Sequence, residues 1–135
     1  MAEVSVRFAG YAAVFDVPDR GGDVVRRGAF RRAGPVPLLW QHAGAPVGTI
    51  EALAEDKRGL RVIGRVETPE LAAALAQGAV TGLSFGYRVT EARGNARREI
   101  KALDLLEISL VASPMQPLAR VHAVAPGAAA ATARR

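Results

Sequence analysis

Three side chains in this sequence could together carry hydrolytic chemistry: His42, Ser84 and Glu107. A serine hydroxyl becomes a nucleophile when an imidazole accepts its proton, and a carboxylate can fix the tautomer of that imidazole and stabilise its cation. Hydrolase triads occur in several chain orders, so the order His, Ser, Glu decides little. The chain has no cysteine, which excludes a thiol nucleophile, thiolate metal sites and disulfides, and leaves histidine for proton transfer near neutral pH.

Each of these residues also has a purely structural explanation. His42 ends the apolar stretch PLLWQ, where a histidine often only completes a hydrogen bond. Ser84 follows Thr81-Gly82, and serine close to glycine is typical of turns. Glu107 interrupts an apolar strand, and burying a carboxylate is costly unless it is paired, although exposure on a sheet edge would remove that cost. The residue types alone leave both explanations open.

The elements that must position these residues are mostly strands. Residues 3–9 alternate apolar and polar side chains, which predicts a half-buried strand that continues to Phe15. The Gly-, Pro- and Asp-rich segment 16–30 predicts a loop with short ordered pieces, and PLLWQH, residues 37–42, predicts the next strand.

Two further strand pairs follow in the chain. A hairpin is predicted with one arm ending at Ala54 and a second arm at 60–67. The other pair is predicted at roughly 83–92 and 98–112, joined by a tight turn at Gly94-Asn95. Between the pairs, a hydroxyl cap at Thr68, a proline at the first helical position and a glycine at 78 predict a helix near 69–77.

Length and composition indicate one domain. The chain has 135 residues with 50% apolar content, enough for a modest core. We expect the domain to cover 1–124 and the low-complexity segment 125–135 to be a flexible tail. No stretch approaches the ~18 apolar residues of a membrane helix, and the amino terminus lacks a leader pattern, so we expect a soluble intracellular protein.

The formal charge of +5 raises the alternative of a nucleic-acid-binding domain. The arginines are scattered between clusters at 26–32, 93–98 and the carboxy terminus, and aromatic residues make up only 5% of the chain, which gives little surface for stacking on bases. Nucleic acid is therefore the less favoured partner.

The segment Gly82-Leu83-Ser84-Phe85-Gly86 matches the G-x-S-x-G pattern of α/β-hydrolases literally. That pattern requires a strand before the serine and a helix after it. Here the predicted order is helix first and strand second, and the chain is too short for that fold, so we reject the match.

Several longer stretches of the chain carry a resemblance to known proteins: GYAAVFDVPDRGGDVVRRGAF, LLWQH, GLRVIGRV, GAVTGLSFGYRV and LDLLEISLVASPMQPLARV. Together they resemble the capsid-maturation (prohead) serine proteases of tailed bacteriophages, including the branch in phage-like gene transfer agents. The resemblance covers about residues 6–124 and extends distantly to the herpesvirus assembly proteases.

The resemblance implies a mainly β fold, a bent β-barrel with few helices. It also implies that His42 is the general base and Ser84 the nucleophile, since both match the family's motifs. Herpesvirus relatives use a second histidine as the third member, whereas the strand LLEISLV places Glu107 there. Asp104, which faces the other side of that strand, and His122, near the tail, are the alternatives.

The function implied by the resemblance is a serine endopeptidase that needs no cofactor or metal. It would cleave the scaffold or amino-terminal segment of the major capsid protein, and itself, inside the immature capsid in the bacterial cytoplasm. We expect the oxyanion donors in the turn 112–116. The chain is shorter than typical members, which leaves a homodimer open. A catalytically inactive scaffold or capsid-binding module is the main alternative.

Overall fold

The computed structural model describes residues 5–95 and 97–127, and strands dominate it. The mainly β fold class and the helix predicted near 69–77 are confirmed. The elements, in chain order, are β1 (Val6–Val14), β2 (Val24–Val25), β3 (Leu38–Trp40), β4 (Ala43–Glu55), β5 (Gly59–Val66), α1 (Pro69–Ala76), β6 (Gly82–Arg93), β7 (Glu99–Val111) and β8 (Val121–Pro126).

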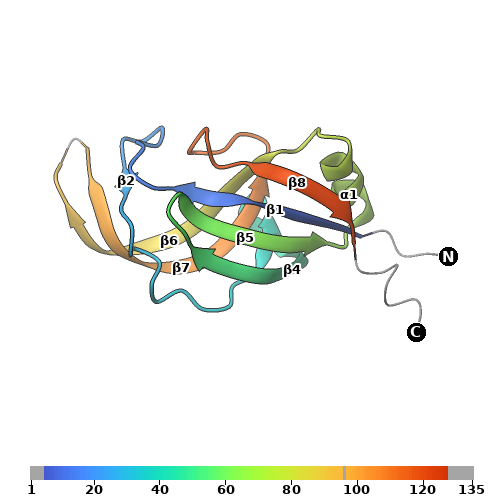
Figure 1. The fold of residues 1–135 in the computed structure, drawn as a ribbon, viewed down its shortest axis with the longest axis horizontal. Helices are drawn as coiled ribbons and strands as arrows, with labels where there is room; N and C mark the ends of the chain where they lie inside the picture. The colour runs from blue at the N-terminus through green and yellow to red at the C-terminus, as the bar shows by residue number, and fades with distance from the viewer. Residues whose placement is uncertain (1–4, 96, 128–135) are drawn as a thin grey trace.

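The strands form one strongly curved sheet. Its order is β2-β7-β3-β4-β5-β1-β8, and β6 pairs with β7. Figure 1 shows β8, β1, β5 and β4 side by side in front of the long β6–β7 hairpin. The start of β6 meets the segment before β8 through a bridge between Gly82 and Arg120. No continuous ladder closes the described strands into a complete barrel, so the bent barrel has an open side.

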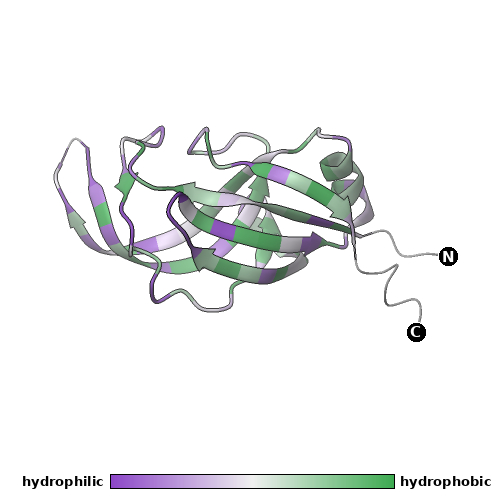
Figure 2. Ribbon diagram, in the orientation of Figure 1, coloured by the Kyte–Doolittle hydropathy of each residue, from purple (hydrophilic) through white to green (hydrophobic). Residues whose placement is uncertain are grey.

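The core lies inside this curve and explains the apolar patterns. In β5 the buried and half-buried residues alternate, as expected for a strand with one face on the core. The end of β7 reads as nearly continuous apolar sequence because both of its faces are buried there: Ile108 and Leu110 are 0% exposed and Val111 is 4% exposed. Figure 2 shows hydrophobic colour along the strands and hydrophilic colour in many connecting loops. Fully buried large side chains include Phe8, Leu38, Leu60, Leu75, Leu83, Ile108 and Leu110.

Two local details differ from the sequence prediction. Thr68 precedes α1 with extended backbone angles, but its hydroxyl makes no capping hydrogen bond and instead donates to the Val47 carbonyl at 3.5 Å. Strand β8 was not predicted, and it pairs with β1 through Pro126, two residues into the segment expected to be a tail. The rest of that expected tail, 128–135, lies outside the described residues.

The helix content is small. Helix α1 has eight residues, and no helix within the described part of the chain is long and apolar enough to cross a membrane.

Candidate active site

Strand β7 brings the three candidate residues into one neighbourhood. On one edge, Leu38–Trp40 of β3 runs parallel to residues 108–110, so His42 follows directly beyond this pairing. On the other edge, β6 runs antiparallel and places Ser84 opposite Ser109. Glu107 lies two residues before Ser109 on β7 and therefore on the same face of that strand.

The sequence had predicted His42 at the end of a strand. In the structure His42 instead lies in a strained two-residue turn. Strand β3 ends at Trp40, which pairs with Ala43 of β4. Gln41 and His42 between them have φ angles of 55° and 62°, a conformation that type I′ hairpin turns require and that usually selects Asn or Gly. Such backbone costs on the order of 1–3 kcal/mol per residue and persists only where the surroundings hold it.

Three hydrogen bonds hold this turn against the end of β7. The Gln41 side-chain oxygen accepts the Ala112 N–H at 2.7 Å, and the Gln41 N–H donates to the Leu110 carbonyl at 3.0 Å. The His42 N–H donates to the Ser109 hydroxyl at 3.0 Å. The turn is thus tied to the end of β7 and gives the imidazole a defined direction.

Glu107 connects the imidazole to the sheet. Its Oε2 lies 2.6 Å from His42 Nδ1, and its Oε1 accepts the Ser109 hydroxyl at 2.7 Å. The Glu107 side chain is only 13% exposed, so the carboxylate is not an exposed edge residue. The Glu107 carboxylate occupies this position because Gly86, opposite it on β6, has no side chain. A Cβ on Gly86 would overlap the carboxylate. With Nδ1 directed at the carboxylate, Nε2 is the ring nitrogen that can serve another group.

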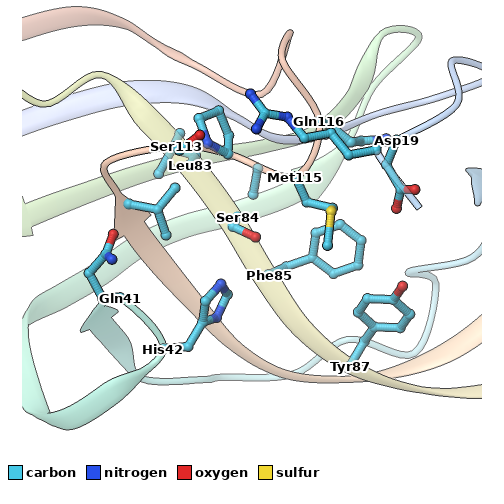
Figure 3. A pocket seen from close by; sticks show the side chains of 14 residues that line it. Asp19, Gln41, His42, Leu83, Ser84, Phe85, Tyr87, Ser113, Met115 and Gln116 are labelled. Carbon is cyan, nitrogen blue, oxygen red and sulfur yellow. The ribbon is translucent and has the colours of Figure 1, made fainter. Parts of the chain in front are cut away.

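His42 and Ser84 line the same pocket, which has a volume of about 450 Å³. In Figure 3 Ser84 lies near the middle of the view and His42 below it, with Gln41, Leu83 and Ser113 towards the left and Phe85, Met115 and Tyr87 towards the right. Ser84 is 8% exposed. No direct hydrogen bond joins its hydroxyl to His42 among the described residues. Nucleophile and base in unliganded enzymes are often farther apart than in the substrate complex.

These features, a serine and a carboxylate-bound histidine on the wall of one pocket, agree with a comparison of the whole chain. Residues 2–133 match the family described as Caudovirus prohead serine protease. The chain belongs to this family.

One relative within the family is the prohead protease of Enterobacteria phage HK97, which is 35% identical over 136 residues. The match covers 87% of this chain and 59% of the phage protein, so this family member spans about three-fifths of that relative's length. The resemblance to prohead proteases is confirmed, whereas the gene transfer agent branch stays a prediction.

A solved structure also resembles the fold. The KSHV protease in complex with a hexapeptide phosphonate inhibitor aligns with a TM-score of 0.62 at 15% identity, covering 96% of this chain and 69% of the viral chain. At this identity the similarity concerns the fold alone, and it confirms the expected likeness to herpesvirus proteases.

The two alternative third members lie elsewhere. The Asp104 carboxylate accepts a hydrogen bond from Arg88 at 2.9 Å, in an exposed ion pair. The His122 ring packs on Tyr11, with 5.6 Å between ring centroids. Neither residue lines the pocket. Of the three candidates for the third position, Glu107 is the one in contact with His42.

On the side of the pocket lined by Tyr87, a second set of polar side chains interacts: Tyr87, Asp23 and Arg98. The Tyr87 hydroxyl donates to Asp23 at 3.3 Å, and Asp23 pairs with Arg98 at 2.8 Å. Burial raises the pKa of Tyr87, and the nearby Asp23 carboxylate raises it further, so the phenol remains neutral. The Tyr87 ring also packs on Phe85 at 4.7 Å between centroids, which gives this side of the pocket a firm aromatic surface.

Several residues of the site escaped the sequence interpretation. Gly86, Tyr87 and Met115 stood within stretches that the sequence had singled out, but the sequence did not show that Gly86 makes room for Glu107 or that Tyr87 and Met115 line the pocket. Ser109 did give one: a polar residue inside an apolar strand, two positions from Glu107 and on the same face. That signal could have been used.

Proposed function

We propose that this chain is a serine endopeptidase of capsid maturation, with Ser84 as nucleophile, His42 as general base and Glu107 as the carboxylate that orients His42. The observation that carries the proposal is the 2.6 Å contact between Glu107 and His42 Nδ1 at a pocket that also holds Ser84. Membership of the prohead serine protease family supports it.

The proposed reaction has two halves. The Ser84 oxygen attacks a peptide carbonyl while its proton passes to Nε2 of His42; the C–N bond then breaks, and the imidazolium gives this proton to the leaving amine. A water molecule next attacks the resulting ester, again losing a proton to His42, and the ester bond breaks to release the acid and restore the Ser84 hydroxyl. Glu107 stabilises the imidazolium in both halves.

The oxyanion donors are proposed to come from the turn 112–116. Ser113, Met115 and Gln116 line the pocket. The Ala112 N–H already donates to the Gln41 side chain. The backbone N–H groups of Ser113, Met115 and Gln116 are therefore the proposed donors. The buried Gln116 anchors the turn, since its side-chain amide exchanges two hydrogen bonds with the Val14 backbone at 2.8 and 3.1 Å. An anchored turn can present donors without reorganisation, and losing one such donor costs about 10²-fold or more in rate.

The proposed substrates are extended segments of the major capsid protein or its scaffold, and the protease itself, inside the immature capsid. Phe85, Tyr87 and Met115 give one side of the pocket an apolar surface suited to an apolar substrate side chain. Confinement with the substrate raises the local concentration, so weak sequence recognition would suffice.

The test is co-expression of the full chain with its capsid protein. Ser84→Ala should leave the capsid protein uncleaved while the variant still folds, because the hydroxyl is lost without a change in strand pairing. Thr90→Ala, an exposed hydroxyl on the same strand, is the matched control and should process normally. Mass mapping of the fragments measures the outcome. Normal processing by Ser84→Ala would refute the nucleophile assignment.

An inactive capsid-binding module is the competing proposal, and a fluorophosphonate probe separates the two. The probe should label wild-type Ser84 and spare Ser84→Ala, whereas an inactive module would label in neither case. Two arginines of the basic clusters are already engaged within the protein: Arg26 pairs with Asp16 and Glu99, and Arg98 pairs with Asp23.

A further inference from the structure

Ser109 occupies an unusual position for a polar residue. It is 0% exposed, near the end of β7, opposite Ser84 of β6 and in register with Leu39 of β3. It does not line the pocket, so it has no access to a substrate. A hydroxyl buried this deeply must be hydrogen-bonded to avoid a desolvation cost.

The Ser109 hydroxyl meets that requirement with two partners that both lead to His42. It donates to Glu107 Oε1 at 2.7 Å, and it accepts the His42 N–H at 3.0 Å. The second oxygen of the same carboxylate contacts His42 Nδ1. One hydroxyl therefore holds the main chain of His42 and also the group that orients its ring.

Both contacts resist a specific motion. A carboxylate held at one oxygen can rotate about its last side-chain bond, and the second contact at Oε1 opposes this rotation. His42 has a φ of 62°, which a non-glycine residue keeps only where its surroundings over-determine it. The bond from the His42 N–H to Ser109 supplies part of that constraint.

We infer that Ser109 is a positioning residue, whose hydroxyl fixes Glu107 and the Gln41-His42 turn together so that the imidazole stays aimed at the pocket. This inference rests on the proposed function, because it assigns Ser109 a role in the reaction of Ser84 and His42. Ser109 itself touches neither the substrate nor the reacting atoms.

Two substitutions test the role of the hydroxyl. Ser109→Ala removes the donor and acceptor, and Ser109→Cys keeps a similar volume but offers only a weak donor. For both we expect kcat per folded enzyme to fall by about 10- to 100-fold with little change in KM, since a lost hydrogen bond to a charged group corresponds to this range of rates. If Ser109 only fills space, Ser109→Cys keeps the wild-type kcat, which would overturn the inference.

Thr81→Val is the matched control, because it also removes a hydroxyl that is hydrogen-bonded to a charged side chain. Thr81 Oγ1 accepts a hydrogen bond from Arg120 at 2.9 Å, and Thr81 lies outside the pocket. The melting temperature of this variant should fall, but its kcat should remain that of the wild type. An equal loss of kcat in Thr81→Val would mean that general destabilisation explains the Ser109 variants, and would refute the positioning role.

A spectroscopic measurement keeps the inference testable if the proposed function fails. In wild type, the proton between His42 Nδ1 and Glu107 should give a proton NMR signal far downfield of the amides. In folded Ser109→Ala or Ser109→Cys this signal should broaden or move, whereas Thr81→Val should leave it in place. An unchanged signal in both Ser109 variants overturns the inference, whatever the wild-type activity. A signal that responds as expected, in a protein that cleaves no peptide, leaves the positioning of His42 by Ser109 standing and refutes only the protease proposal.

Discussion

The two histidines of the chain lie in regions built from similar residue types. His42 contacts the Glu107 carboxylate at 2.6 Å. His122 of β8 packs on Tyr11 of β1, whose hydroxyl donates to the Asp56 carboxylate at 2.5 Å. Each region thus holds a histidine, a carboxylate and a hydroxyl, yet only the first is proposed to carry chemistry.

The carboxylates make the difference between the regions. Glu107 is 13% exposed, and its second oxygen is held by the buried Ser109. Asp56 is exposed in the β4–β5 turn, where its Oδ1 accepts the N–H groups of Arg58 and Gly59 at 2.8 and 3.2 Å. Glu107 therefore orients a ring beside a pocket, whereas Asp56 stabilises a hairpin turn. Residue types alone do not distinguish the two; burial and neighbours do.

The largest expected effect comes from removing each histidine in turn. His42→Ala should lower kcat/KM on a capsid-protein segment by about 10⁴-fold or more, because the loss of the general base of a triad removes most of the catalysis. His122→Ala is the matched control and should retain nearly full activity, since its ring packs on Tyr11 and does not line the pocket. Comparable losses in both variants would show that the two regions do not differ in the way proposed.

The second-largest effect on activity is expected from a change at the Glu107 carboxylate. Glu107→Gln keeps the shape of the side chain but removes the charge that stabilises the imidazolium, and we expect kcat to fall by about 10²- to 10⁴-fold. Asp104→Asn, three residues earlier on β7, should cost less than about 3-fold, because Asp104 is engaged in an exposed ion pair with Arg88. Single-turnover kinetics on both variants measures this. The reverse ranking would move the orienting role to Asp104.

The sequence predicted the fold well where the pattern is local. The alternation in β5, the proline and glycine around α1, and the two hairpins each depend on neighbours a few residues away, and their bounds agree with the structure within a few residues. Strand β8 was missed because its stretch VHAVAP lacks large apolar residues and is mostly exposed. Its pairing depends on β1, more than a hundred residues earlier, which no local pattern encodes.

The candidate site was predictable only in part. His42, Ser84 and Glu107 were singled out because each is a polar residue where the pattern favours an apolar or turn residue. The turn conformation of Gln41-His42 was not predictable, since the pair has φ angles of 55° and 62° but is not one of the Asn-Gly, Asp-Gly or Gly-Gly pairs that usually mark such a turn. The role of Ser109 depends on β7 lying between β3 and β6, a parallel and an antiparallel pairing that bring distant segments together. Long-range pairing of this kind leaves little trace in a single sequence.

The smallest expected effect concerns Asp56, the carboxylate of the second region. The hydrogen bond from Tyr11 lowers the pKa of Asp56, with the turn N–H groups adding to it, and the same bond raises the pKa of Tyr11. A carboxyl whose pKa is lower in the folded state adds stability above its unfolded value of about 3.9, and this stability disappears as the pH falls through the folded value. Asp56→Asn should therefore reduce the free energy of unfolding at pH 7, by less than about 1 kcal/mol because the group is exposed.

The difference between wild type and Asp56→Asn should shrink below about pH 4 and vanish once the carboxyl is protonated in both states. Urea unfolding across this range measures it, and peptidase activity at pH 7 should be unchanged. A gap that persists at low pH would assign the effect to the shape of the turn rather than to charge. A loss of activity in Asp56→Asn would instead couple the second region to the pocket, and the separation between a structural and a chemical carboxylate would no longer hold.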